Sequence, residues 1–265
     1  MTGLFDQERR KLIGVVHLKP LPGAPGYEGS MGAVLEAAAL DASRLAEGGA
    51  DAIIVENFGD TPFFADAVPS ETIAAMTIAV ERVRRSAAEL EVGVNVLRND
   101  ARGALGVCAA TGASFLRVNV LCGAAATDQG VITGEAAALL RERARVAPEV
   151  KIFADVHVKH ATPIGSTSLV ESAAETAGRG GADALIFTGS RTGSPPEVSE
   201  LDDVRERLGA HPIFIGSGLD AENAAGLLAY ATGAIVGSSL KEDGVHSPVD
   251  LKKVQRLRAA MDATS

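Results

Sequence analysis

Eight short apolar runs recur along the 265 residues of this chain, and segments rich in Ala, Leu, Glu and Arg separate most of them. The runs cover residues 12–17, 52–56, 92–97, 114–120, 151–158, 184–188, 213–215 and 234–236. Segments with helical character include residues 31–47, 71–89, 134–147, 168–179 and 248–261. Strands that alternate with helices predict a parallel sheet. Eight such units in this length favour an α/β fold, a closed (β/α)8 TIM barrel forming one domain over residues 1–265.

Charge and cysteine content narrow the classes of function. Acidic residues outnumber basic ones by 34 to 25, and no Lys/Arg block stands out, so we expect no nucleic-acid binding. Cys108 and Cys122 lack the spacing of a disulfide framework, which favours a reduced, cytoplasmic setting. The N-terminal segment has no apolar signal-peptide core, and the longest uncharged run, 223–240, contains Gly, Asn and Ser. We therefore predict no membrane span, and leave a homo-oligomer open.

Loop lengths indicate which end of the barrel carries the chemistry. Connections from helix to strand are tight, whereas several connections from strand to helix are long, such as "LKPLPGAPGYEGS" and "NFGDTPFFADAVPS". Barrels of this kind place their sites on the loops that follow the strands. We expect the functional site at the carboxyl ends of the strands.

The last two expected strands both end in glycine and serine. The stretch "IFIGSGLDAEN" passes from an apolar strand through Gly216, Ser217 and Gly218 to a helix expected to open at Asp220. The eighth strand ends at Gly237 and Ser238. Glycine lets a backbone approach a ligand closely, and the loops after the last two strands of such barrels commonly bind phosphate. Two ordinary tight turns are the alternative. The stretch lacks the third glycine of a dinucleotide fingerprint.

Strand alternation also predicts polar side chains that point into the barrel. In "SFLRVNV" the apolar residues share the face that packs on helices, so the polar residues between them face inward. The same register, applied to each strand and its end, selects His17, Glu56, Asn95, Arg117, Asn119, Asp155, His157, Lys159 and Thr188. Buried polar groups need partners. The set is therefore either a buried structural network or an active site, and jointly it favours an active site.

The residue types suggest roles at such a site. Asp155 or Glu56 is a candidate base for proton abstraction, with His157 as the complementary acid. Lys159 is a candidate for Schiff-base formation.

Other members of the set would bind the substrate or assist the reaction. The amides of Asn95 and Asn119 would bind sugar hydroxyls or a developing oxyanion, and Arg117 and Thr188 are further substrate-binding candidates. We predict no cofactor. A divalent metal is a rival hypothesis, with N and O ligands from His17, Glu56, Asp155 and His157.

The loop "FTGSRTGSPP" follows the sixth expected strand. Gly189 and Arg191 lie in it, next to the predicted phosphate site. It is either a lid whose Arg191 closes on an anionic substrate or an ordinary surface loop, and its position favours the lid.

Several of these stretches together resemble the BtpA family, named for a photosystem I biogenesis factor. The matching segments are "HLKPLPGAPGYEG", "GGADAIIVENFGDTPF", "GVNVLRND", "LRVNVLCGAAATDQG", "ADVHVKHA", "TGSRTGSPP" and "FIGSGLDAENA". The resemblance implies a barrel of the ribulose-phosphate-binding type, and it carries no settled reaction.

Two hypotheses of function follow. The first is an enzyme that acts on a phosphorylated small molecule, a sugar phosphate or a nucleotide, by isomerisation, epimerisation, aldol-type cleavage or cleavage of a glycosidic bond. The second, implied by the family name, is a non-catalytic assembly factor in photosystem I biogenesis.

Overall fold

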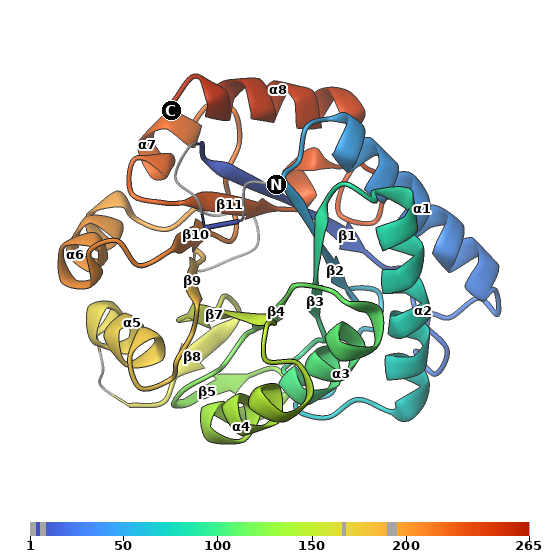
Figure 1. Cartoon of the computed structure of the whole chain (residues 1–265), viewed down its shortest axis with the longest axis horizontal. Coiled ribbons are helices and arrows are strands. Elements are labelled where there is room, and N and C mark those ends of the chain that lie inside the picture. Colours follow the sequence, from blue (N-terminus) through green and yellow to red (C-terminus); the bar gives the residue numbers. More distant parts are fainter. Residues whose placement is uncertain (1–3, 6–8, 166–167, 190–194, 265) are drawn as a thin grey trace.

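The computed structural model describes residues 4–5, 9–165, 168–189 and 195–264. Eight parallel strands close into a barrel in the order β1-β11-β10-β9-β7-β4-β3-β2 (Figure 1). These strands are β1 Lys11–His17, β2 Ala52–Glu56, β3 Glu91–Asn95, β4 Phe115–Val118, β7 Lys151–Val156, β9 Ala184–Phe187, β10 Ile213–Ile215 and β11 Gly233–Val236. The predicted TIM barrel is confirmed.

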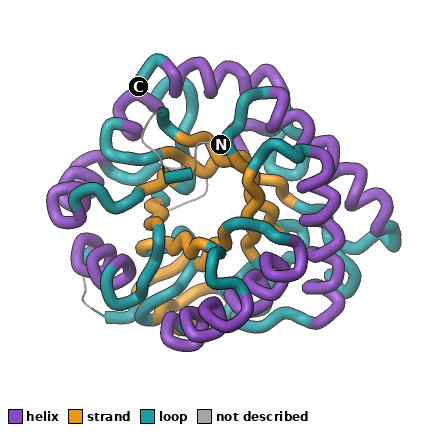
Figure 2. Tube along the Cα trace, in the orientation of Figure 1, coloured by secondary structure: helices purple, strands orange, loops and turns teal. Residues whose placement is uncertain are grey.

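Helices surround this barrel on the outside, as Figure 2 shows. They are α1 Met31–Glu47, α2 Ser70–Ser86, α3 Ala101–Thr111, α4 Ala136–Val146, α5 Leu169–Ala177, α6 Val198–Leu208, α7 Ala224–Leu228 and α8 Leu251–Asp262, with a 3-10 turn, η1, at Ser238–Leu240. In the described part of the chain, none of them has both the length and the apolar character needed to cross a bilayer.

The helix expected to open at Asp220 begins later, at Ala224. The Asp220 carboxylate accepts hydrogen bonds from the backbone N–H groups of Glu222 and Asn223, both at 3.0 Å. The backbone N–H of Ala224 also donates to the Asp220 carbonyl oxygen at 3.1 Å. These are the bonds of a helix N-cap, so Asp220 caps the turn at residues 221–223 that leads into the short α7.

A small antiparallel sheet was missed by the sequence analysis. It has the order β6-β5-β8, with β5 at Ala124–Thr127, β6 at Gly130–Thr133 and β8 at Ala161–Pro163. The first two strands lie between the run 114–120 and the helical segment 134–147, in a stretch that the sequence analysis left as a long connection, and the Ala-rich part of this stretch has low strand propensity. Pairing with β8, which is distant in sequence, supplies what local propensity lacks.

An aromatic layer fills the barrel interior beneath the polar residues. The rings of Phe115 and Phe214 lie 4.8 and 5.0 Å from that of Phe153, and Phe5 stacks on Phe153 from the N-terminal segment at 5.6 Å. Side chains two residues apart on a strand share a face. Arg117, two residues after Phe115 on β4, therefore belongs to the next layer, nearer the carboxyl ends.

Gly93 on β3 makes room for this aromatic layer. A Cβ atom at Gly93 would lie 2.2 Å from Cε2 of Phe115. Replacing Gly93 with Ala is expected to lower the free energy of unfolding by about 1–3 kcal/mol, because the ring has to shift. Urea denaturation measures the change.

Gly106 is the matched control for this substitution. It lies on the exposed side of α3 with no heavy atom within 4 Å of its ideal Cβ position. Gly106→Ala is expected to raise the free energy of unfolding by about 0.5–1 kcal/mol, because Ala is the better helix former. Equal stabilities for Gly93→Ala and the wild type would contradict the packing argument.

Candidate active site

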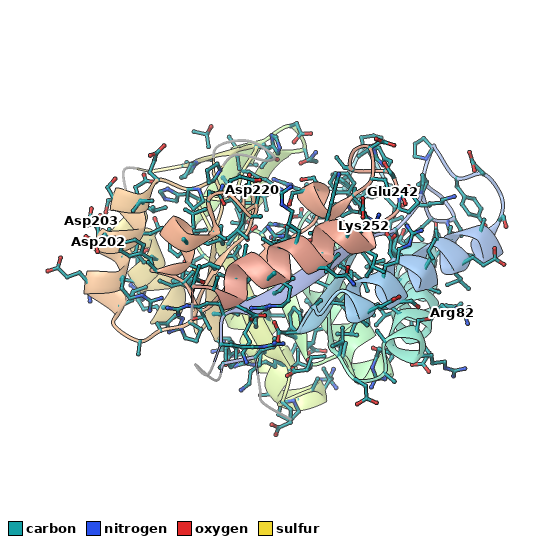
Figure 3. The ribbon with its side chains drawn as sticks, turned by 90° about the horizontal axis from the view of Figure 1, so that it is seen from above. Arg82, Asp202, Asp203, Asp220, Glu242 and Lys252 are labelled. Atoms are coloured by element: carbon teal, nitrogen blue, oxygen red, sulfur yellow. The ribbon has the colours of Figure 1, made fainter. Side chains whose placement is uncertain are left out.

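A cavity of about 290 Å³ opens at the carboxyl ends of the barrel strands. In the side view of Figure 3, Asp220 and Glu242, which follow β10 and β11, lie toward the upper edge, and Arg82, late in α2, lies lower. Of the predicted residues, the cavity is lined by His17, Glu56, Asn95, Arg117, Asn119, Lys159, Gly216, Ser217, Gly218, Gly237 and Ser238. The two glycine-serine ends and most of the polar set thus meet in one place.

Arg117 is the centre of a buried network at the floor of this cavity. Its Nε and Nη2 donate to the two carboxylate oxygens of Asp155, each at 3.1 Å, and its Nη1 donates to Glu56 Oε1 at 3.1 Å. Asn119 Nδ2 donates to Asp155 Oδ2 at 2.6 Å. Asn95 Nδ2 donates to Glu56 Oε1 at 3.1 Å. Side chains from β2, β3, β4 and β7 are thereby fixed relative to one another.

The two carboxylates of this network differ in what they offer to a ligand. The side chain of Asp155 is fully buried, and both of its oxygens are engaged by Arg117 and Asn119. Asp155 is not among the residues that line the cavity. Glu56 lines it, and among the described residues its Oε2 accepts no hydrogen bond. Asp155 therefore orients Arg117, and Glu56 is the carboxylate that borders the cavity.

Electrostatics keep Glu56 ionised. Burial alone would raise the pKa of Glu56, but the nearby Arg117 and the Asn95 hydrogen bond hold this pKa below its usual range. For Arg117, burial would lower the pKa, but Asp155 and Glu56 raise it above its ordinary value. Both groups are therefore charged at neutral pH.

His17 is held as a neutral imidazole beside Glu56. Its Nδ1 lies 3.3 Å from the carbonyl oxygen of Val245, which only accepts, so Nδ1 carries the proton and Nε2 has a free lone pair. Nε2 lies 3.9 Å from Glu56 Oε2, and the ring stacks on Phe58 at 4.4 Å. Burial lowers the pKa of His17 to about 4, despite the opposing influence of Glu56.

Lys159 faces the cavity from the segment after β7. Burial, and then the charge of Arg117, lower the pKa of its amine. In the described part of the chain, its Nζ has no hydrogen-bond or ion-pair partner. Its backbone N–H donates to Thr188 Oγ1 at 3.1 Å, so Thr188 supports this segment and does not itself line the cavity.

His157, unlike most of the predicted set, does not line the large cavity. Strand β7 ends at Val156, and His157 has a left-handed φ of 51°, which interrupts the alternation. Its Nε2 lies 2.9 Å from Ser172 Oγ, in a second cavity of about 80 Å³ bordered by α5 and β8. The four residues named as possible metal ligands do not converge, and the described residues contain no group of three or more His, Cys, Asp or Glu side chains able to hold a metal ion.

The glycines after β10 and β11 serve packing as well as access. A Cβ atom at Gly216 would lie 2.4 Å from Ile186 Cγ2, and one at Gly237 would lie 3.0 Å from the His17 ring. Gly218 has a φ of 72°, which favours glycine. The backbone N–H of Gly189 donates to Ser217 Oγ at 3.3 Å, which joins the loop after β9 to this site.

Arg191 lies in the part of the predicted lid, residues 190–194, that is outside the described residues.

Arg98 is a cavity residue that the sequence analysis did not select. It is 7% exposed, and its Nη2 donates to the Lys159 carbonyl oxygen at 2.8 Å. The signal in the sequence was its place in "VLRND", directly after an expected strand. The alternation of side chains along β3 could not predict where the Arg98 side chain points, because the strand ends at Asn95 and Arg98 lies in the loop that follows.

Comparisons with known proteins place the chain among relatives. A model of the BtpA family matches residues 8–263. The photosystem I biogenesis protein BtpA of Synechocystis sp. is 45% identical over 256 residues, which cover 96% of this chain and 89% of that protein. An uncharacterised protein of Pyrococcus abyssi is 44% identical over 254 residues, which cover 96% of each chain.

Solved structures share the fold at low identity. Phosphoribosyl anthranilate isomerase from Thermus thermophilus superposes with a TM-score of 0.59 and 14% identity, and the match covers 96% of this chain and 100% of that one. An octameric Rubisco from Pyrococcus horikoshii gives a TM-score of 0.58 at 15% identity, over 97% of this chain and 60% of that one. These likenesses concern the barrel alone. The family match over residues 8–263 and the identity to its relatives show that the chain belongs to the BtpA family.

Proposed function

We propose that this protein is an enzyme acting on a phosphorylated small molecule, a sugar phosphate or a nucleotide, by acid–base chemistry. One observation carries the proposal: a single cavity is lined by the glycine-serine ends of β10 and β11 and by Glu56 and Lys159. An anchor for phosphate and groups able to move protons are thereby within reach of one ligand.

Backbone groups and positive charge both favour an anionic ligand in this cavity. Gly216–Gly218 and Gly237–Ser239 line the cavity from adjacent strands, and η1 starts at Ser238. Backbone N–H groups at such glycine-rich ends bind phosphate oxygens in many proteins. Arg98 and Lys159 in the same cavity add positive charge. Both features support an anionic ligand.

Glu56 is the proposed base. It is ionised, it borders the cavity, and Arg117 fixes one of its oxygens while Oε2 faces away from that ion pair. In this role it accepts a proton from a substrate carbon or hydroxyl, and Asn95 and Arg117 hold its orientation. Such proton transfer serves an isomerase, an epimerase, a lyase or a glycosidase, and Lys159 remains the candidate for Schiff-base chemistry.

A ligand screen tests the anchor. A phosphorylated ligand at a hundred times its Kd is expected to raise the free energy of unfolding by about 2.7 kcal/mol, visible as a higher Tm. Ser238→Asp should abolish this stabilisation, because the new carboxylate repels phosphate. Ser238→Asn, which has the same shape without the charge, should retain most of it.

Conversion of the ligand tests catalysis. Each stabilising ligand is incubated with the protein and followed by NMR. We expect turnover in the wild type and a loss of about 100-fold or more in Glu56→Gln, with binding retained. Binding that resists Ser238→Asp would overturn the phosphate anchor, and turnover that survives Glu56→Gln would overturn the role of Glu56.

The name of the Synechocystis relative supports a second candidate, a role in photosystem I biogenesis. That protein is 45% identical to this chain, and a role in assembly requires no turnover. Failure of every sugar phosphate and nucleotide to stabilise the protein would favour this second candidate over the first.

A further inference from the structure

Two cations in the cavity make no ion pair in the part of the chain that the structure describes. Arg98 is buried, its Nη2 donates to a backbone carbonyl, and its Nε has no hydrogen-bond partner. Lys159 is the neighbouring cation, because its own backbone carbonyl oxygen accepts this hydrogen bond from Arg98. Among residues 4–5, 9–165, 168–189 and 195–264, no carboxylate lies within 4.0 Å of either charged group.

The contrast with Arg117 shows how unusual this is. Arg117 is equally buried in the same cavity, and it makes ion pairs with both Glu56 and Asp155. Buried charges in proteins are normally paired, because removal from water is costly. Burial also lowers the pKa of both Arg98 and Lys159. An anion bound in the cavity next to Arg98 and Lys159 would balance both positive charges.

Arg98 does not adjoin the glycine-serine ends. It follows β3, and in the barrel order β10-β9-β7-β4-β3 this strand lies four places from β10. In a ring of eight strands that is the opposite side of the barrel, as Figure 1 also shows. One phosphate bound at Gly216–Gly218 therefore leaves Arg98 without an ion-pair partner.

We propose that the cavity binds a small molecule with two anionic groups, one a phosphate at the ends of β10 and β11 and the other, a carboxylate or a second phosphate, at Arg98 and Lys159. This inference rests on the proposed function and narrows its substrate class. Glu56 and Asn95, which line the same cavity, then face the carbon skeleton that joins the two groups. Asn119 Oδ1, buried and without a hydrogen-bond partner in the described residues, offers an acceptor to a hydroxyl on that skeleton.

Matched pairs of ligands test the proposal by calorimetric titration of the 265-residue chain. Glycerol 3-phosphate and 3-phosphoglycerate differ in a second anion that is a carboxylate. Fructose 6-phosphate and fructose 1,6-bisphosphate differ in one that is a phosphate. In at least one pair we expect the doubly anionic member to bind about tenfold more tightly or better, and the pair that shows it identifies the second group.

Variants then assign the preference to its residues. Arg98→Met should reduce the ratio of the two Kd values to about one and change the Kd of the singly anionic ligand less than about threefold. Lys159→Met is the second variant, because it keeps the backbone carbonyl that Arg98 binds, and it should reduce the same ratio. Arg98→Lys, which retains charge, should keep part of the preference.

The possible outcomes test the second anion site separately from the proposed function. Equal affinities within both pairs, or a preference that survives both Arg98→Met and Lys159→Met, would overturn the second anion site. If the singly anionic ligands still bind in that case, the proposed function stands. If none of the four ligands binds, both the second site and the phosphate anchor fail.

Discussion

Replacing Arg117 with Met is expected to lower the free energy of unfolding by about 3–5 kcal/mol, because it leaves two buried carboxylates without their shared counter-charge. Glu56 and Asp155 both bind the Arg117 guanidinium, and Asp155 has no exposed side-chain surface. Met retains much of the side-chain volume, so the loss reports charge and hydrogen bonds rather than a cavity. Urea denaturation at neutral pH measures it.

An exposed arginine provides the control for this change. Arg85 pairs with Glu81 on α2, and its side chain is 75% exposed. Arg85→Met is expected to change the free energy of unfolding by less than about 1 kcal/mol, because surface ion pairs contribute little. Losses of similar size in the two variants would contradict the role given to the buried network.

Acidification is expected to destabilise the protein through His17. Its pKa is about 4 in the folded chain and 6.5 as the ordinary value, so between these pH values the unfolded state binds more protons. The contribution of His17 to the free energy of unfolding is therefore fully present above about pH 6.5. It is lost as the pH drops toward 4, and the loss is on the order of 3 kcal/mol. Denaturation midpoints between pH 7 and 4.5 follow the loss.

Two variants isolate the contribution of this imidazole. His17→Phe keeps a ring against Phe58 but removes the titrating group, and should flatten the dependence of stability on pH in this window. His246 is exposed and its ring lies 5.8 Å from that of Phe58, so His246→Phe is the same substitution at a second histidine beside this ring. If His17→Phe retained the full slope, acid sensitivity would have to come from other groups.

The sequence predicted most of the barrel and much of the cavity because both follow from a period of two along each strand. On β4 the alternation put Arg117 and Asn119 inward, and the hydrogen bonds of both to Asp155 agree. That logic ends where the strand ends. His157 lies one residue past β7 with a left-handed backbone, and Arg98 lies in a loop after β3, so their directions depend on contacts distant in sequence.

The same limit explains two other differences. The sheet of β5, β6 and β8 depends on pairing between segments more than thirty residues apart, such as Ala125 with Pro163, which local propensity does not encode. At α7, a turn capped by the Asp220 carboxylate precedes the helix, which begins at Ala224. The first difference is a regular element where composition favoured a loop, and the second is a turn where the sequence favoured the start of a helix.

The accessory sheet adds a second link between two neighbouring walls of the cavity, which follow the paired barrel strands β4 and β7. Strand β5 starts shortly after Asn119, and β8 starts shortly after Lys159, and these two strands pair with each other. A change in the length of the hairpin at Asp128 and Gln129 is expected to affect the segments after Asn119 and Lys159 together, because both segments lead into this sheet. Replacing this one hairpin by that of a relative would therefore change which ligands the cavity binds without a change in the barrel.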